Sequence, residues 1–177
     1  MPFPEPMSID QIRSLIRDVP DFPQPGILFR DITPMLANGE ALHTAAALLA
    51  SPFERVDLVA AIESRGFILG APVALELGAG LVPVRKAGRL PFKTIRAEYS
   101  LEYGANTLEM HNDAIAPGQR VLIVDDLLAT GGTVGATIRL VEELGGEIVG
   151  ISVLAELTFL NGRNAVKPYT VHSLIAY

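Results

Sequence analysis

The sequence predicts an α/β protein whose central sheet is mainly parallel and flanked by helices. Two observations carry this prediction: apolar runs without polar alternation, and segments of helical spacing that lie between such runs. The clearest runs are Leu58–Ile62, Leu81–Val84 and Val121–Val124. Continuous apolar strands are typical of sheets buried on both faces. Strands that alternate with helices through short connections favour this fold class.

Composition limits the class of protein further. A chain of 177 residues suits one domain, 1–177, with a substantial core. Hydrophobic residues make up 49% and charged residues 19%, which argues against disorder. The net charge of −6 disfavours a nucleic-acid surface, and the absence of cysteine excludes disulfides and thiolate metal sites. No apolar run approaches the ~20 residues that cross a membrane, and the start lacks a signal-peptide pattern. We therefore expect a soluble cytoplasmic protein.

The first 34 residues read as a helix followed by a rigid loop. Residues 1–7 are proline-rich, and Ser8 is suited to cap a helix from Ile9 to about Arg17. Val19–Gly26 contains three prolines and a glycine, which predicts irregular structure, and Ile27–Thr33 is a short extended segment. A loop this apolar either covers the core or forms the wall of a ligand pocket, and its residues alone leave both readings open.

The remaining elements follow in order along the chain. Residues 90–107 show no clear period and predict an extended hairpin that stands off the main sheet. The expected helices are 39–50, 67–77 and about 134–144, and the further strands are 147–154 and 170–176, with a turn at Asn161–Arg163.

The stretch Val121–Thr133 holds the strongest chemical signal. A strand ends in Asp125 and Asp126, and the loop Ala129-Thr130-Gly131-Gly132-Thr133 leads into a helix. Glycines allow backbone N–H groups to converge at a helix N-terminus, where an anion such as phosphate binds. The two carboxylates suit ribose hydroxyls or a hydrated cation. Together they predict a phosphate beside a sugar or a metal.

Two other loops should meet the same edge of the sheet, since ligands bind beyond the carboxyl ends of parallel strands. They are Glu63-Ser64-Arg65-Gly66 and Arg85–Arg89, which bring cations at positions 65, 85, 86 and 89. Taken alone, the cationic run is typical of a solvated turn. No Walker A motif or serine nucleophile elbow occurs, and His43, His111 and His172 lack the spacing of a triad or metal site.

These motifs together resemble the type I phosphoribosyltransferases. Val121–Thr133 resembles the family's binding signature for 5-phosphoribosyl-1-pyrophosphate (PRPP), and its part from Val124 to Thr133 has the form found in the adenine-specific members. Further matching segments occur in the family's order over roughly residues 8–177. They are Phe22–Pro34, Glu63–Phe67, Arg85-Lys86, Tyr99–Gly104 and Glu156–Thr158. The resemblance implies the family fold, with an N-terminal hood over residues 1–34 and a flexible lid loop over 90–108.

The resemblance also implies a reaction, in which Mg²⁺-dependent transfer of ribose 5-phosphate from PRPP to N9 of adenine gives AMP and pyrophosphate in purine salvage. Ala129–Thr133 would hold the 5′-phosphate, and Asp125 and Asp126 the ribose hydroxyls. The pyrophosphate would lie on Glu63, Ser64, Arg65, Gly66, Arg85, Lys86 and Arg89. Adenine would lie against Ile27, Leu28, Phe29 and Arg30. Mg²⁺ would bind mainly PRPP oxygens and water.

By resemblance, the lid carries Glu102 as the general base, with Tyr103 beside it. Ala87 and Arg89 depart from the proline and lysine common in the family, and a forked guanidinium at position 89 changes the expected pyrophosphate geometry. Family members are usually homodimers. Two rivals remain at this point: a transferase for another purine base, and a PRPP-sensing regulator without catalysis. The phosphate loop does not distinguish the purine bases, but Phe22–Pro34 and Leu101–Gly104 favour adenine. The acidic net charge, the short N-terminal tail and Glu102 count against a regulator.

Overall fold

A seven-stranded sheet forms the centre of the protein, whose computed structural model describes residues 6–101 and 104–177. The strand order is β5-β6-β4-β3-β7-β8-β9. The five strands from β4 to β9 in this order are parallel, and β6 joins β4 in the antiparallel direction. Their bounds are β3 Leu58–Ile62, β4 Gly80–Lys86, β5 Thr94–Leu101, β6 Gly104–His111, β7 Arg120–Leu128, β8 Glu147–Glu156 and β9 Val171–Ala176. The predicted fold class is confirmed.

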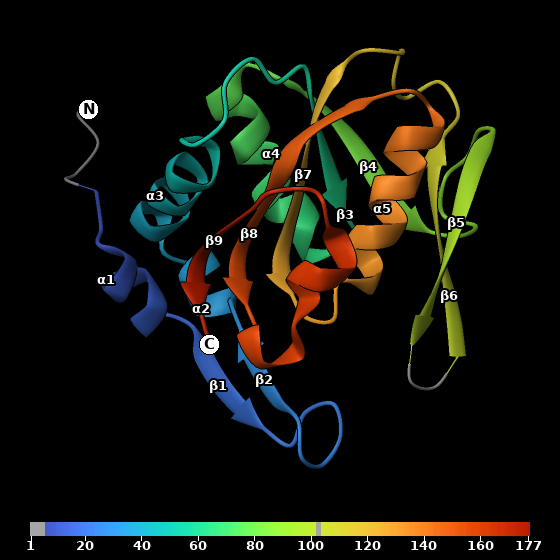
Figure 1. The fold of residues 1–177 in the computed structure, drawn as a ribbon. Coiled ribbons are helices and arrows are strands. Elements are labelled where there is room, and N and C mark those ends of the chain that lie inside the picture. Colours follow the sequence, from blue (N-terminus) through green and yellow to red (C-terminus); the bar gives the residue numbers. More distant parts are fainter. Residues whose placement is uncertain (1–5, 102–103) are drawn as a thin grey trace.

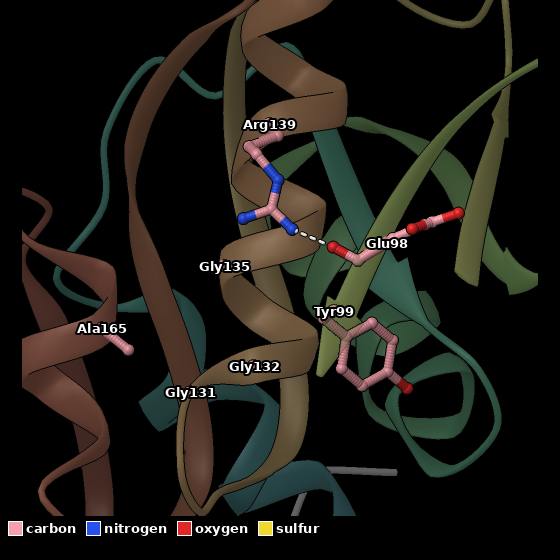
Figure 2. Close-up of a pocket in the computed structure, with 7 residues that line it drawn as sticks. All are labelled: Glu98, Tyr99, Gly131, Gly132, Gly135, Arg139 and Ala165. Carbon is pink, nitrogen blue, oxygen red and sulfur yellow. Dashed lines mark hydrogen bonds between the residues drawn. The ribbon is translucent and has the colours of Figure 1, made fainter. Parts of the chain in front are cut away.

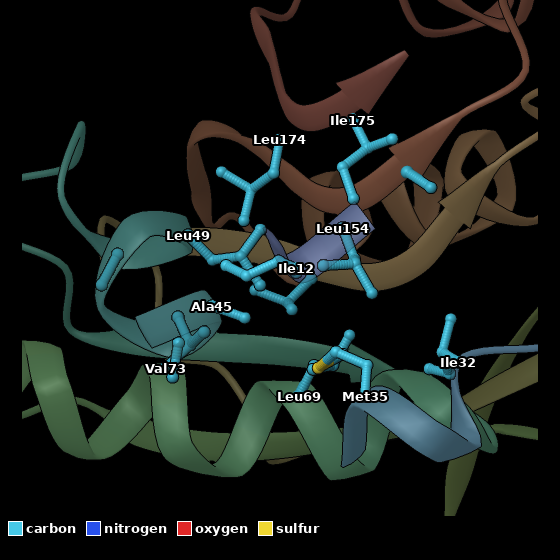
Figure 3. Close-up of a cluster of buried hydrophobic side chains, with 14 of the residues drawn as sticks. Ile12, Ile32, Met35, Ala45, Leu49, Leu69, Val73, Leu154, Leu174 and Ile175 are labelled. Atoms are coloured by element: carbon cyan, nitrogen blue, oxygen red, sulfur yellow. The ribbon is translucent and has the colours of Figure 1, made fainter. Parts of the chain in front are cut away.

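Helices cover both faces of this sheet (Figure 1). On one face lie α3 (Gly39–Ala50) and α4 (Arg65–Leu77), and on the other lies α5 (Gly132–Glu143). The central strand β7 shows why both layers are needed. Leu122 and Val124 pack into the cluster under α3 and α4 that Figure 3 shows, whereas Val121 and Ile123 pack into the cluster under α5. Successive side chains of a strand point to opposite faces, so an all-apolar strand requires cover on both.

The N-terminal segment forms a separate two-stranded sheet, which we call the hood. Helix α1 (Ile9–Ser14) is capped by Ser8, β1 (Arg17–Pro20) pairs antiparallel with β2 (Leu28–Asp31), and α2 (Thr33–Leu36) follows. The helix therefore ends earlier than predicted. The expectation of irregular structure from Val19 onward was wrong for Val19 and Pro20, because a proline is tolerated at the end of an exposed two-stranded ribbon. Residues 1–5 lie outside the described part of the chain.

Two further boundaries differ from the predictions. Strand β7 continues to Leu128, so Asp125 and Asp126 lie within the strand and do not end it, because β8 pairs with β7 as far as Leu128. Helix α4 begins at Arg65, two residues before the expected start. The predicted hairpin is confirmed as β5–β6, but it does not stand off the main sheet, because β6 pairs with β4 and the hairpin forms one edge of the seven-stranded sheet (Figure 1). In the described residues, no helix is long and apolar enough to span a membrane.

Candidate functional site

The phosphate loop connects β7 to α5, and its shape depends on Gly131 of the loop and on Gly162, which packs against it. Gly131 has a left-handed backbone (φ +86°) and stands at the N-cap of α5. A short 3₁₀ element, η2 (Gly162–Val166), packs against the loop from behind, and a Cβ at Gly131 would lie 2.6 Å from the Gly162 carbonyl oxygen. The loop encloses a hollow of about 50 Å³ lined by residues 127–134. A small hollow lined by main chain at a helix N-terminus suits a phosphate group.

A cleft of about 240 Å³ lies directly beside this hollow. The cleft and the hollow share Leu127 and Thr133 in their linings, so the two adjoin. The predicted site residues that line the cleft come from all three expected loops, and Tyr99 and Leu108 of the hairpin complete it. Those site residues are Glu63, Ser64, Arg65, Lys86, Asp125, Asp126 and Thr133. The structure therefore brings the predicted loops together at one edge of the sheet.

Asp125 and Asp126 are buried in the floor of the cleft, at 8% and 6% exposure. Arg65 binds Asp126 (Nε to Oδ2, 2.9 Å), and the Asp126 N–H donates to Asp125 Oδ1 at 2.9 Å. Burial, and then the charge of Asp126, raise the pKa of Asp125 well above its usual range. Burial also raises the pKa of Asp126, although Arg65 opposes it. Two adjacent carboxyls held apart from water favour a cationic or hydroxyl-bearing ligand.

The main chain at Gly66 also lies close to the acidic pair Asp125 and Asp126. A Cβ at Gly66 would lie 2.9 Å from Asp125 Oδ1 and 3.1 Å from the Val124 carbonyl oxygen. Only glycine allows the first turn of α4 to pass this close to β7. Gly66 therefore leaves the space that the Asp125 side chain occupies. The Glu63–Ser64 peptide bond, which lies just before Gly66, is cis.

Glu63 organises the cationic turn at the end of β4. Its carboxylate accepts from Arg85 (Nε, 3.1 Å; Nη2, 3.4 Å) and from the Lys86 N–H at 3.0 Å. Burial alone would raise the pKa of Glu63, but the bonds from Arg85 and Lys86 outweigh it and lower the pKa. Arg85 also donates to the Arg89 carbonyl oxygen at 3.1 Å. In the described part of the chain, Lys86 faces the cleft whereas Arg85 and Arg89 are not among the cleft-lining residues.

Glu109 holds the other end of that turn, and sequence reasoning missed it. The residue is 1% exposed, and its Oε1 accepts from the N–H groups of Arg89 (2.8 Å) and Leu90 (2.9 Å). Arg96 in β5 binds the second carboxylate oxygen (Nε to Oε2, 3.5 Å). Burial opposes ionisation, yet these backbone bonds hold the pKa of Glu109 below its ordinary value. No local pattern marks Glu109, because a charged residue in an alternating strand ordinarily faces solvent.

The hood approaches the cleft at Arg65. The Arg65 guanidinium lies 4.9 Å from the Phe29 ring centroid, and Phe29 in turn packs edge-to-face on Phe22 at 5.1 Å. Ile27 and Leu28 are exposed, at 39% and 45%. Exposed apolar side chains beside a cleft suit a flat aromatic ligand. Glu102 and Tyr103 fall outside the described residues, so the lid assignments remain predictions.

A larger groove of about 550 Å³ lies on the outer side of the phosphate loop, between β5 and α5 (Figure 2). Its wall is formed by Glu98 and Tyr99 on one side and Arg139 on the other, above Gly131, Gly132 and Gly135. Arg139 donates to the Glu98 carbonyl oxygen at 2.5 Å, which ties the hairpin to α5. The acidic pair, Arg65 and Lys86 line the smaller cleft, so the candidate site is the cleft and not this groove.

Comparisons with known proteins agree with this geometry. The sequence profile of the phosphoribosyl transferase domain matches residues 34–171. The adenine phosphoribosyltransferase of Rhodopirellula baltica is 55% identical over 168 residues, which cover 94% of this chain and 82% of that protein. The enzyme of the same name from Caldanaerobacter subterraneus is 53% identical over 97% of this chain and 100% of its own.

Solved structures show the same similarity. The crystal structure of adenine phosphoribosyltransferase from Rhodothermus marinus superposes with a TM-score of 0.92 at 53% identity and covers 96% of this chain and 98% of that one. The enzyme from Saccharomyces cerevisiae, complexed with D-2,5-dideoxy-2,5-imino-altritol 1,6-bisphosphate and adenine, gives a TM-score of 0.89 at 37% identity, covering 94% of this chain and 97% of that one.

Proposed function

This chain belongs to the adenine phosphoribosyltransferases, whose reaction moves the 5-phosphoribosyl group of PRPP to N9 of adenine and releases pyrophosphate, and we propose which of its residues carry each part. The observation that carries the proposal is that the phosphate hollow adjoins the acidic cleft at Leu127 and Thr133. PRPP has a phosphate, a ribose and a pyrophosphate in that order, and we assign the hollow, the acidic pair and the cationic loops to these parts in the same order.

The 5′-phosphate binds in the hollow formed by Ala129, Thr130, Gly131, Gly132 and Thr133. Support comes from the hollow that these residues line and from its place at the N-terminus of α5, where helices bind anions. Asp125 and Asp126 accept hydrogen bonds from the ribose 2′- and 3′-hydroxyls. Both carboxyl groups are buried and line the cleft, where hydroxyl donors would offset the cost of burying them.

The pyrophosphate binds at the opposite end of the cleft, on the main chain of Ser64 and Gly66 and the side chains of Arg65 and Lys86. These four residues stand where α4 begins and β4 ends. Arg85 and Arg89 form the outer part of this site, since Glu63 holds Arg85 beside the Lys86 N–H. Cations here neutralise the charge that the leaving pyrophosphate gains.

Mg²⁺ fits this site through its substrate more than through the protein. In the described residues no three His, Cys, Asp or Glu side chains gather into a metal-binding group, but Asp125 and Asp126 stand together. Mg²⁺ commonly keeps water and binds through one or two carboxylates plus substrate phosphates. When bound, it supplies positive charge to the departing pyrophosphate.

Adenine binds between the hood and Arg65, with its edge read by the main chain of Leu28 and Arg30 and its face against Ile27 and Phe29. In the reaction the bond from C1′ to the pyrophosphate oxygen breaks and the bond from C1′ to N9 forms. The proton of N9 passes to Glu102, the proposed general base. Tyr103 and the rest of the 90–108 lid exclude water that would hydrolyse PRPP.

We also propose a cytoplasmic homodimer. The exposed apolar side chains Ile68 (47%) and Leu75 (83%) lie seven residues apart on α4, so they share one side of the helix. Exposed apolar side chains on one side of a helix favour contact with a second copy. Light scattering on the purified protein would test this, and a monomer at micromolar concentration would contradict it.

The central test is an assay of nucleotide formation from PRPP, Mg²⁺ and each purine base in turn, with products separated by chromatography. We expect AMP from adenine and little product from hypoxanthine, xanthine or guanine. The double variant Asp125→Asn/Asp126→Asn is the control that assigns the activity to this cleft. Faster turnover of hypoxanthine would show that the base assignment is wrong, and no nucleotide from any base would refute the function.

A further inference from the structure

The hood is attached to the rest of the protein by side chains and not by the central sheet. Among the described residues, β1 and β2 pair with each other and form a sheet of their own. A base that binds against Ile27–Arg30 requires these residues at a fixed distance from the cleft. The side-chain contacts that hold β2 therefore set the geometry of the base pocket.

Tyr177 offers a rigid platform at the root of the hood, where Figure 1 places the C-terminal end of the chain beside β1 and β2. Its N–H donates to the Glu156 carbonyl oxygen at 2.9 Å. Its main-chain oxygen accepts from Thr158 N (3.0 Å) and Thr158 Oγ1 (2.6 Å). The half-buried ring also packs against the apolar cluster of Figure 3. The core, and not the hood, therefore decides where this ring lies.

Two arginines lie over the Tyr177 ring. The guanidinium carbon of Arg30 in β2 is 3.8 Å from the ring centroid, and that of Arg13 in α1 is 5.3 Å away. Both distances fall within the range of a cation–π interaction. The Arg30 side chain is only 17% exposed, and it also binds Asp18 of β1. One guanidinium thus joins both strands of the hood to a ring that the core holds.

The contacts around Arg30 differ from those around Phe29. Phe29 meets Arg65, which belongs to the cleft and pairs with Asp126. Arg30 meets Tyr177, which is not among the residues that line the cleft or the phosphate hollow. Of these two contacts of β2, one therefore lies at the site and the other lies outside it, and the Tyr177 ring can be removed without changing a cleft residue.

We propose that Tyr177 is a positioning residue for the purine base, which holds β2 through Arg30 so that the main chain of Leu28 and Arg30 stays at the edge of the base pocket. This inference rests on the proposed function. A purely structural role for Tyr177 would lower thermal stability and weaken both substrates alike. A positioning role affects adenine selectively, because PRPP binds to loops that the ring does not touch.

The test compares Tyr177→Leu, which removes the aromatic ring, with Tyr177→Phe, which keeps it. Tyr169→Leu is a matched control, since it removes a tyrosine ring that packs in the other core cluster and donates to Glu142. KM for adenine, KM for PRPP, kcat and Tm are measured for each. For Tyr177→Leu we expect KM for adenine to rise roughly three- to tenfold, as the loss of a cation–π contact predicts. KM for PRPP and kcat should stay within about twofold, and Tyr177→Phe should restore the wild-type KM for adenine.

Arg30→Gln provides a second variant, which removes the cation and leaves the ring, in case Tyr177→Leu does not fold. It should show the same selective rise in KM for adenine. A wild-type KM for adenine in the Leu and Gln variants, or a parallel rise in both KM values, would overturn the inference while the enzyme still forms AMP. Wild-type protein that forms no AMP would instead overturn the proposed function itself, which separates the two failures.

Discussion

Gly131 of the phosphate loop allows a sharp test, because Gly135, one turn further along in α5, is a matched control. Gly131→Ala places a Cβ 2.6 Å from the Gly162 carbonyl oxygen and 2.8 Å from the Ala165 Cβ, at a residue whose φ is +86°. A left-handed backbone costs a residue with a Cβ about 1–2 kcal/mol. Overpacking against main chain costs roughly a further 1–3 kcal/mol. The sum is about 2–5 kcal/mol of the free energy of unfolding.

Gly135→Ala is the control. Its Cβ would have the Ala165 carbonyl oxygen at 3.7 Å as its nearest neighbour, which is ordinary contact. Alanine in a helix is more stable than glycine by about 1 kcal/mol, so this variant should be neutral or stabilised.

The assay combines thermal unfolding with KM for PRPP. At about 2–4 °C per kcal/mol for a chain of this size, Gly131→Ala should lower Tm on the order of 5–15 °C. If the loop instead moves to accommodate the Cβ, KM for PRPP should rise by about tenfold or more, as expected for displaced phosphate donors. Gly135→Ala should change neither quantity for the worse. Wild-type values of both Tm and KM in Gly131→Ala would refute the idea that η2 fixes the loop.

The remaining predictions concern two carboxylates, the proposed general base Glu102 and the buried Asp125. Glu102→Gln should lower kcat by roughly 10²–10⁴-fold with little change in PRPP binding, and an unchanged kcat would remove Glu102 from the mechanism. Burial raises the pKa of Asp125, so this group ionises at a lower pH in the unfolded chain than in the folded protein. The free energy of unfolding therefore falls as pH rises from about 4 through the pKa of the folded state. Asp125→Asn should therefore raise Tm at pH 7.5 but not at pH 3, while weakening PRPP binding; equal shifts at both pH values would contradict this.

Much of the fold could be predicted because its strands are apolar throughout. Leu58–Ile62 coincides with β3. An uninterrupted apolar run of this length predicts a strand that is buried on both faces. The extension of β7 past Asp126 could not be predicted. Aspartate is rare in strands, and only pairing with β8, a contact between distant segments, keeps the backbone extended there.

The same distinction applies to the site. The phosphate loop is a local motif, so its residues could be assigned from consecutive letters of the sequence. Glu109 and Tyr177 act on residues 20 and 147 positions away, Arg89 and Arg30. Neither has a local signal, and a buried carboxylate that organises a turn looks like a surface residue until the chain is folded.

The junction of the hairpin with the sheet has a mechanical consequence. Strand β6 is joined to β4 over a short stretch: Arg85 lies opposite Glu109, Lys86 lies opposite Leu108, and the Ala87 N–H donates to the Thr107 carbonyl oxygen at 3.0 Å. From Leu108 the strand runs four residues to Gly104, roughly 14 Å at ~3.4 Å per residue. A rotation of about ten degrees at the junction would therefore carry that end through roughly 2–3 Å, by the same strand length. The pivot of this lever is the end of β4, so Arg85 and Lys86 would stay in place while the Gly104 end of β6 moves.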